Sequence, residues 1–296
     1  MPHTGRKFNM KKMTLLFILI SLTANAQTWQ EELQSWKKDR VQRLKKPHGW
    51  LSLIGMEWLH EGSNRIGSDA SNDIVLPNGP AHVGEFTLTA AKITFTPEKG
   101  VQIKANDELI DKTINVAMDS SGKPTVFAID TFKFYVIERG KPALRIKDSQ
   151  AETRKNFTRI DYFPANEKFK IEAEFVAYNP PKEIEIINVL GLLKKEESIG
   201  FVKFSIDGKE FQLDALDAED EMFIIFADKT SGRTTYGPGR FLSVPKPKDN
   251  HNKVVVDFNK AYNPPCAFND YSTCPLPPHQ NRIRVFIEAG EKTYKH

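Results

Sequence analysis

Four residues in the last third of the chain have side chains that could form a polar site. Asp257 and Asn259 alternate along one predicted strand, so both face the same side of it. Arg240 follows a Gly-Pro-Gly turn and could pair with Asp257 or bind an anionic group through two parallel hydrogen bonds. Tyr262 could stack on a ligand or donate a hydrogen bond. Such a set can orient a small molecule, and a carboxylate such as Asp257 can serve as a general base.

The same residues also have a structural interpretation. Buried charges must be paired whether or not they take part in function, so Arg240 and Asp257 could instead lock a loop through a buried salt-bridge network. Arg145, Asp148 and Arg159 could join either arrangement. Both interpretations stay open at the level of sequence.

The first 26 residues have the layout of a secretory signal peptide. Residues 1–13 carry four basic side chains and no acid, residues 14–22 form a short apolar run, and Ala24-Asn25-Ala26 offers the small residues that a signal peptidase reads. The apolar run is too short to span a bilayer, which takes about 20 residues. We expect cleavage after Ala26 and an exported protein, periplasmic or secreted, that starts at Met1 or Met10.

This leader also accounts for the net charge. The chain has 42 Lys plus Arg and 38 Asp plus Glu, a formal net charge of +4. Removing the leader's four basic residues leaves equal numbers of basic and acidic side chains. The remainder has no basic block with interleaved aromatics and no second long apolar run, so we expect neither nucleic-acid binding nor a transmembrane segment. No cofactor motif is present, and we expect no cofactor.

Two cysteines, Cys266 and Cys274, bracket a loop that prolines stiffen. Because two cysteines follow an export signal, we expect a disulfide, and closing a loop of roughly nine residues would stabilise the fold by about 2.5 kcal/mol. The alternatives are a nucleophilic Cys266 and a metal site of Cys266, Cys274 and His279. An acidic cluster within residues 214–221 could bind calcium or form a solvated turn. We expect no metal.

The elements that must position these residues are mostly strands. Trp29, Leu33, Trp36 and Leu44 have helical spacing and predict a strap helix over residues 29–46, which Pro47 ends. Short runs that alternate apolar and polar residues then predict strands, and Asp207-Gly208 predicts a tight hairpin. The expected strands are residues 49–59, 83–88, 92–96, 101–105, 131–139, 143–147, 168–178, 182–188, 200–206, 209–216, 222–227, 253–258 and 282–289.

Regular strand spacing without helical patterns predicts an all-β, mostly antiparallel fold. A polar stretch near residues 148–155 suggests a boundary. We therefore expect a β-sandwich-like domain with the N-terminal helix at residues 27–150 and a C-terminal β-rich domain at residues 151–296.

A series of motifs in the last third resembles a known family. The motifs are Gly239-Arg240-Phe241-Leu242, Asp257-Phe258-Asn259, Tyr262-Asn263-Pro264-Pro265-Cys266-Ala267-Phe268, Cys274-Pro275-Leu276-Pro277-Pro278, Asn281-Arg282 and Ala289-Gly290-Glu291. This series resembles the signature of DUF1684, a domain of unknown function of bacteria and archaea. The resemblance covers residues 50–292, and His279 departs from the pattern. It implies no reaction.

Residues 64–77 also resemble the opening of a forkhead-associated domain, with Ile66-Gly67, a polar loop and Asp73-Ile74-Val75-Leu76. This resemblance implies a β-sandwich. It does not imply phosphothreonine binding, because Ser68 stands where that family has Arg and residues 79–82 lack its Ser.

Three functions follow from these patterns. The preferred hypothesis is a small-ligand-binding module with a polar pocket, whose candidate residues are Arg240, Asp257, Asn259, Tyr262, Arg145 and Arg159. The second is an exported hydrolase in which Asp257 is the general base and Arg240 stabilises an anion. The third is a structural protein of the cell envelope. No nucleophile–base motif occurs, so whether the protein is an enzyme stays open.

Overall fold

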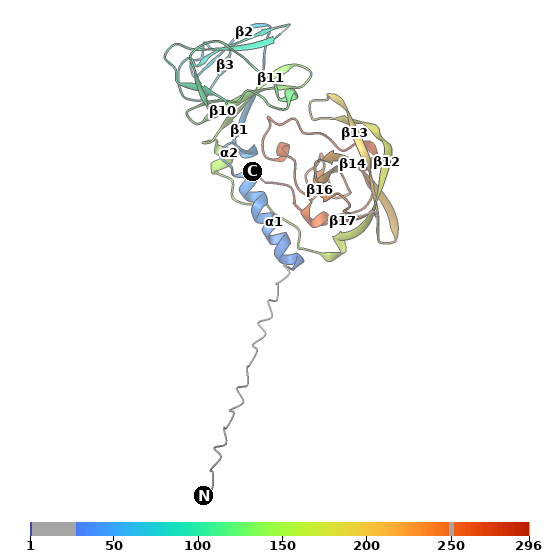
Figure 1. Cartoon of the computed structure of the whole chain (residues 1–296). Coiled ribbons are helices and arrows are strands. Elements are labelled where there is room, and N and C mark those ends of the chain that lie inside the picture. Colours follow the sequence, from blue (N-terminus) through green and yellow to red (C-terminus); the bar gives the residue numbers. More distant parts are fainter. Residues whose placement is uncertain (2–27, 91, 249–251, 296) are drawn as a thin grey trace.

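The computed structural model describes Met1 and residues 28–90, 92–248 and 252–295. The expected signal peptide at residues 1–26 therefore lies outside the described residues, apart from Met1. Three sheets dominate the described chain, with one long helix beside them (Figure 1). The pairing is almost entirely antiparallel, which confirms the all-β prediction. In the described ranges, no helix is both long enough and apolar enough to cross a membrane.

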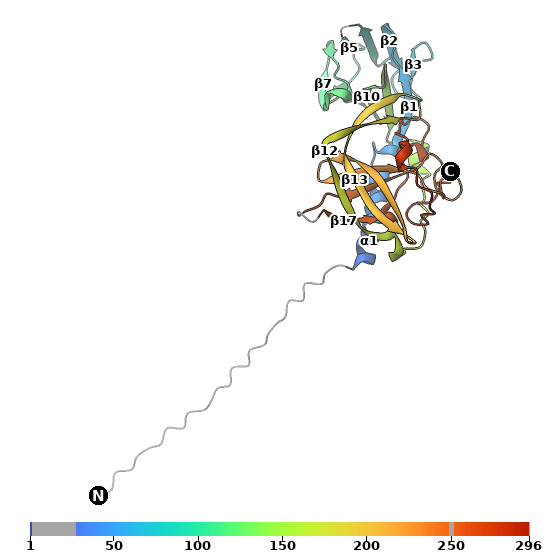
Figure 2. The same cartoon turned by 90° about the vertical axis from the view of Figure 1, so that its right-hand side faces the viewer.

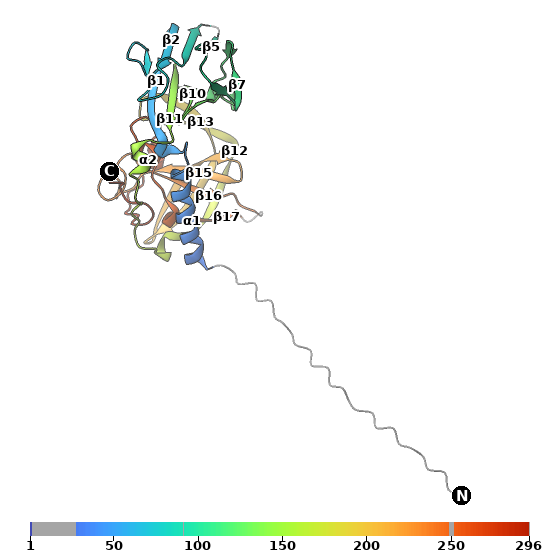
Figure 3. The ribbon, with the colours of Figure 1, turned by 90° about the vertical axis from the view of Figure 1, so that its left-hand side faces the viewer.

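Helix α1 (Trp29–Leu44) confirms the predicted strap, two residues shorter than expected. Its start is fixed by a capping box in which the Thr28 hydroxyl accepts from the Glu31 N–H and the Glu31 carboxylate accepts from the Thr28 N–H. Leu33 and Leu44 are buried beneath it. The helix lies across strands of the third sheet, as Figure 3 shows. Its amino-terminal turns therefore pack against strands that lie far away in the sequence.

Two sheets use residues 53–148. Their facing sides enclose a core that contains the rings of Phe86, Phe95, Phe127 and Phe134, with centroids 4.6–6.2 Å apart. One sheet has the order β1-β11-β10-β9-β6-β7 and the other β3-β2-β4-β5-β8. Their strands are β1 (Leu53–Trp58), β2 (Gly62–Gly67), β3 (Ile74–Val75), β4 (Gly84–Thr89), β5 (Lys92–Pro97), β6 (Ile103–Ala105), β7 (Glu108–Ile110), β8 (Ile114–Asn115), β9 (Phe127–Ile129), β10 (Phe132–Glu138) and β11 (Pro142–Asp148).

The third sheet uses residues 170–257 and has the order β16-β15-β14-β13-β12-β17. It curls strongly (Figure 2), so that the edge strands β16 and β17 come into contact. Its core includes Phe204, Phe226 and Phe258. The strands are β12 (Lys170–Ile187), β13 (Leu193–Ile206), β14 (Lys209–Ala218), β15 (Glu221–Phe226), β16 (Arg240–Pro245) and β17 (Lys253–Asp257).

The predicted hairpin at Asp207-Gly208 is confirmed. Ile206 pairs with Lys209 across it, and both turn residues have positive φ, 51° and 73°. This backbone matches the right-handed twist of the flanking strands, and glycine adopts it without steric cost.

Helical segments outside α1 are short. They are α2 (Glu152–Lys155) and the 3₁₀ turns η1 (Trp50–Ser52), η2 (Asp119–Ser121), η3 (Glu167–Phe169), η4 (Phe258–Lys260), η5 (Pro265–Ala267) and η6 (His279–Asn281). The turn η4 begins where β17 ends, and η5 begins at the second of the paired prolines, Pro265.

Several strand predictions were wrong in detail. Of the predicted strand 49–59, residues 50–52 form the 3₁₀ turn η1. Residues 168–178 and 182–188 form one long strand, β12, instead of two. Residues 282–289 form no strand, although they alternate apolar and polar residues, because the Arg240 side chain takes the carbonyl oxygens of Ile287 and Ala289. Strand β16, which begins at Arg240, was not predicted.

Candidate functional site

Arg240 is almost completely buried, with 1% of its surface exposed. Its guanidinium donates to Asp228 Oδ2 at 3.2 Å, to the Ile287 carbonyl at 3.1 Å and to the Ala289 carbonyl. Asp228 Oδ2 also accepts from the Ile287 N–H at 2.9 Å. The expected pair with Asp257 is therefore not formed. Arg240 and Asp228 instead fasten the irregular segment around residue 287 to the third sheet.

Asp257 and Asn259 hold two other segments in place. Asp257 Oδ2 accepts from the Trp29 indole N–H at 2.8 Å, and Oδ1 accepts from the backbone and side-chain N–H groups of Asn259 at 3.0 and 2.9 Å. The Asn259 Oδ1 accepts from the Asn166 N–H at 2.9 Å. Asp257 thereby caps η4 and fixes the first turn of α1. The two side chains lie together, as their alternation predicts.

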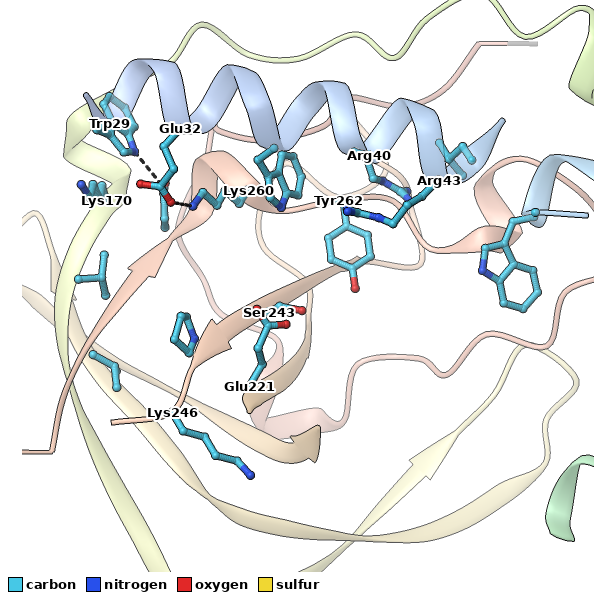
Figure 4. Close-up of a pocket in the computed structure, with 18 of the residues that line it drawn as sticks. Trp29, Glu32, Arg40, Arg43, Lys170, Glu221, Ser243, Lys246, Lys260 and Tyr262 are labelled. Carbon is cyan, nitrogen blue, oxygen red and sulfur yellow. Dashed lines mark hydrogen bonds and ion pairs between the residues drawn. The ribbon is translucent and has the colours of Figure 1, made fainter. Parts of the chain in front are cut away.

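Tyr262 is the predicted site residue with the most open position. Its ring lies 4.8 Å from the Arg40 guanidinium and 5.9 Å from the Phe241 ring, and its hydroxyl hydrogen-bonds with Ser243. Figure 4 shows the hydroxyl directed towards Ser243 within a cleft. Burial raises the pKa of Tyr262, so it is a neutral hydrogen-bonding group near neutral pH.

Arg145 and Arg159 lie apart from this group. Arg159 is exposed and pairs with Asp161 at 3.0 Å. Arg145 is buried, with 4% exposure, and donates to the hydroxyls of Thr273 at 3.3 Å and Tyr135 at 3.5 Å. Its Nε has no hydrogen-bond partner among the described residues.

Cys266 and Cys274 form the expected disulfide, with Cα atoms 6.1 Å apart. The structure thus favours the disulfide over a thiol nucleophile or a thiolate metal ligand at these positions. Asp214 of the acidic cluster is buried and accepts from Tyr178 at 3.0 Å and Gln280 at 2.7 Å. Across the described residues, no group of three or more His, Cys, Asp or Glu side chains could hold a metal ion.

The main concavity is a cleft of about 1670 Å³ between α1 and the edge strands β16 and β17 (Figure 4). It forms there because the curled sheet brings its edges together and α1 bridges them. Tyr262 and Asp257 line it, whereas Arg240, Asn259, Arg145 and Arg159 do not. The structure therefore separates the predicted candidates into two that face the cleft and four that do not.

The cleft is strongly basic. Nine Lys and Arg side chains line it against four acids among the described residues, and the acids are Glu32, Glu172, Glu221 and Asp257. Three of these acids already have partners: Glu32 pairs with Lys260, Glu172 with Lys253 at 2.7 Å, and Asp257 accepts the bonds given above. The hydrogen bond from Lys260 lowers the pKa of Glu32.

Several cations in the cleft have no carboxylate beside them. Within the described part of the chain, Arg43, Lys46 and Lys147 make no ion pair, although all three line the cleft. Arg40 differs, because its Nε pairs with the buried Glu291 at 2.8 Å. Lys170 and Lys248 also line the cleft and form no ion pair among the described residues, and Lys170 lies at the amino end of α1, over the Trp29 ring. Arg43, Lys46 and Lys147 form the group towards the carboxyl end of α1.

Aromatic rings complete the lining. Trp29, Trp36, Trp50 and Tyr262 all face the cleft and are partly exposed. Sequence reasoning assigned the tryptophans of α1 a packing role and missed their place in the lining. The sequence between Trp29 and Trp50 held no clear signal, because Lys and Arg residues are also typical of the solvent face of a structural helix.

Comparison with curated proteins gives no match. Among solved structures, the chain is similar to an uncharacterized protein of Haloarcula marismortui solved by solution NMR, with 28% sequence identity and a TM-score of 0.40. That similarity covers 47% of this chain and 79% of that chain. A family comparison adds that residues 155–292, from the start of the connection to the third sheet to just past Glu291, match the DUF1684 family, described as a protein of unknown function.

Proposed function

We propose that this protein is an exported binding module that holds a small anionic ligand in the cleft beneath α1. The observation that carries the proposal is the surplus of positive charge in one cleft. Nine basic side chains line it, and four of them form ion pairs (Arg40, Lys246, Lys253 and Lys260), which leaves five cations without an ion pair among the described residues. An anion entering the cleft meets positive charge that the protein leaves unbalanced. Low-dielectric walls strengthen that attraction relative to open solvent.

The rest of the lining suits a ligand with an apolar or ring-shaped part. Trp36 and Trp50 offer flat surfaces, and Tyr262 with Ser243 offers a pair of hydroxyls. The cleft is larger than the 300–1,000 Å³ typical of ligand pockets, so a small ligand fills only part of it. Mixed aromatic and basic walls therefore favour an anion that carries a ring.

The geometry supports binding better than hydrolysis with Asp257 as the base. Both oxygens of Asp257 accept hydrogen bonds, one from Trp29 and two from Asn259. These bonds occupy three of the about four lone-pair positions of the carboxylate and hold it to α1 and η4, so Asp257 has a structural role that a free general base does not need. Export is part of the proposal because the disulfide suits an oxidising compartment.

Tryptophan fluorescence tests the proposal directly, since three of the four tryptophans line the cleft. We expect phenyl phosphate to change the emission saturably, whereas phenol at the same concentration does not. The double variant Arg43→Gln/Lys46→Gln should bind phenyl phosphate at least tenfold more weakly, which is about 1.4 kcal/mol. Arg159→Gln, an exposed arginine outside the cleft, is the matched control. Equal binding of phenol, or an unchanged affinity in the double variant, would refute the proposal.

A further inference from the structure

Strand β11 presents two cations that no acid balances. Arg145 and Lys147 are two residues apart and so share one face of the strand. The hydrogen bonds of Arg145 go to the neutral hydroxyls of Tyr135 and Thr273, and those of Lys147 go to the His48 carbonyl at 3.0 Å. Neither makes an ion pair within the described ranges. Arg240, in contrast, is equally buried and has Asp228.

The surroundings of this pair are basic as well. Burial lowers the pKa of His48, and the hydrogen bond with the Thr131 carbonyl opposes this shift. Three cations lower the pKa further, and they are Lys133 of β10, Lys147 of β11 and Arg154 of α2. Burial, with a smaller contribution from Arg145, lowers the pKa of Lys147 to about 8. In both cases burial is the largest cause of the lowered pKa, and neighbouring positive charges add to it.

Aromatic rings position the two cations without neutralising them. The Arg145 guanidinium lies 5.3 Å from the Trp50 ring and 5.9 Å from the Tyr135 ring, and the Lys147 ammonium lies 5.2 and 5.8 Å from the same rings. Such contacts stabilise a cation by about 0.5–2 kcal/mol each, less than a buried ion pair would. They hold the cations in place for a partner of opposite charge.

The cluster opens into the cleft. Lys147, His48 and Trp50 line the cleft together with Arg43 and Lys46 from the carboxyl end of α1. An anion in the cleft can thus reach Lys147 while Arg145 lies behind it. Near three or more uncompensated cations, a group with two negative charges gains more electrostatic binding energy than a group with one. This favours a phosphate monoester over a carboxylate.

We propose that this end of the cleft is an oxyanion subsite that binds the phosphate monoester group of the ligand, with Lys147 as its principal contact and Arg43 and Lys46 completing it. Arg145 does not contact the ligand, but its charge makes the electrostatic potential of the subsite more positive. This inference rests on the proposed function and specifies which part of the cleft holds the charged group. The ring of the ligand then lies along Trp36 and Tyr262.

Inorganic phosphate is the probe for the subsite, and thermal unfolding at constant ionic strength is the readout. Phosphate at about 100 times its Kd should raise the midpoint of the wild-type protein by about 5 °C relative to chloride. Lys147→Met should raise the midpoint in phosphate-free buffer, because a buried uncompensated charge is removed, and should weaken phosphate binding at least tenfold. Arg159→Met should change neither quantity. A lower midpoint together with unchanged phosphate affinity in Lys147→Met would overturn the subsite.

Two further measurements keep this test separate from that of the proposed function. Sulfate does not titrate above pH 6, so its affinity should fall as pH rises through about 8 in the wild type and stay level in Lys147→Arg. If the sulfate affinity of the wild type does not change with pH, Lys147 is not the principal contact. If phenyl phosphate binds Lys147→Met as tightly as the wild type, the subsite is wrong and the cleft proposal stands. If the wild-type protein itself does not bind phenyl phosphate, both fail.

Discussion

Replacing Arg240 with Met should destabilise the protein severely without involving the cleft. The change removes the partner of Asp228, whose side chain has no exposed surface, and leaves the carbonyls of Ile287 and Ala289 without their donor. Breaking a buried ion pair by removing one member costs about 3–5 kcal/mol, because a charge stays buried without compensation. For a chain of this size the midpoint of thermal unfolding should fall by about 10 °C.

Calorimetry and urea unfolding of Arg240→Met, measured against Arg159→Met, would test this reasoning. The Arg159 pair is exposed, and its loss should cost less than 1 kcal/mol. The double variant Arg240→Met/Asp228→Asn should recover part of the loss, since no orphaned carboxylate is left. An Arg240→Met protein within about 1 kcal/mol of the wild type would show that the buried pair does not hold residues 287–291 in place.

Three other outcomes follow from the described contacts. Thiol titration of the native protein should find no free thiol, and Cys266→Ser/Cys274→Ser should lower the free energy of unfolding by about 2.5 kcal/mol in urea titrations. Asp257→Asn should cost about 2 kcal/mol and shift tryptophan emission to the red, because the Trp29 indole loses a charged acceptor. The folded-state pKa of Lys147, about 8, lies below the unfolded value of 10.5, so the unfolded state binds more protons between these values and stability rises with pH across that window. The difference in midpoint between Lys147→Met and the wild type should therefore shrink as pH rises from 7 to 10.

Local patterns in the sequence predicted much of the fold. The spacing of Trp29, Leu33 and Leu44 identified α1, and Asp207-Gly208 identified the hairpin between β13 and β14, because helix periodicity and turn chemistry act over a few residues. Residues 282–289 misled the same reasoning. Their alternation is that of a strand, yet a distant arginine takes two of their carbonyl oxygens, and no local pattern contains that information.

The candidate site was harder to predict for a different reason. A polar side chain can bind a ligand, or it can form the hydrogen bonds that buried backbone groups require. The residue type is the same in both cases, so the sequence alone did not show that Arg240 and Asn259 have the second role. The cations of the cleft come from α1, β11, β12, β17 and η4 and from the residues just after α1 and β16, which only the folded chain brings together. Tyr262 and Asp257 were chosen from the sequence for their side-chain chemistry, and the fold places both of them in the cleft lining.

The buried pair of Arg40 and Glu291 spans 251 positions of the chain and fastens α1 over the cleft. The Arg40 side chain also donates to the Asn263 carbonyl, and Glu291 accepts from the Asn263 N–H. During synthesis, this closure must wait until residue 291 has left the ribosome, so the nascent chain has no finished cleft. A protease that cut before Glu291 would remove this tie from the second half of α1, whereas Trp29 and Glu32 would still hold its first turn to Asp257 and Lys260.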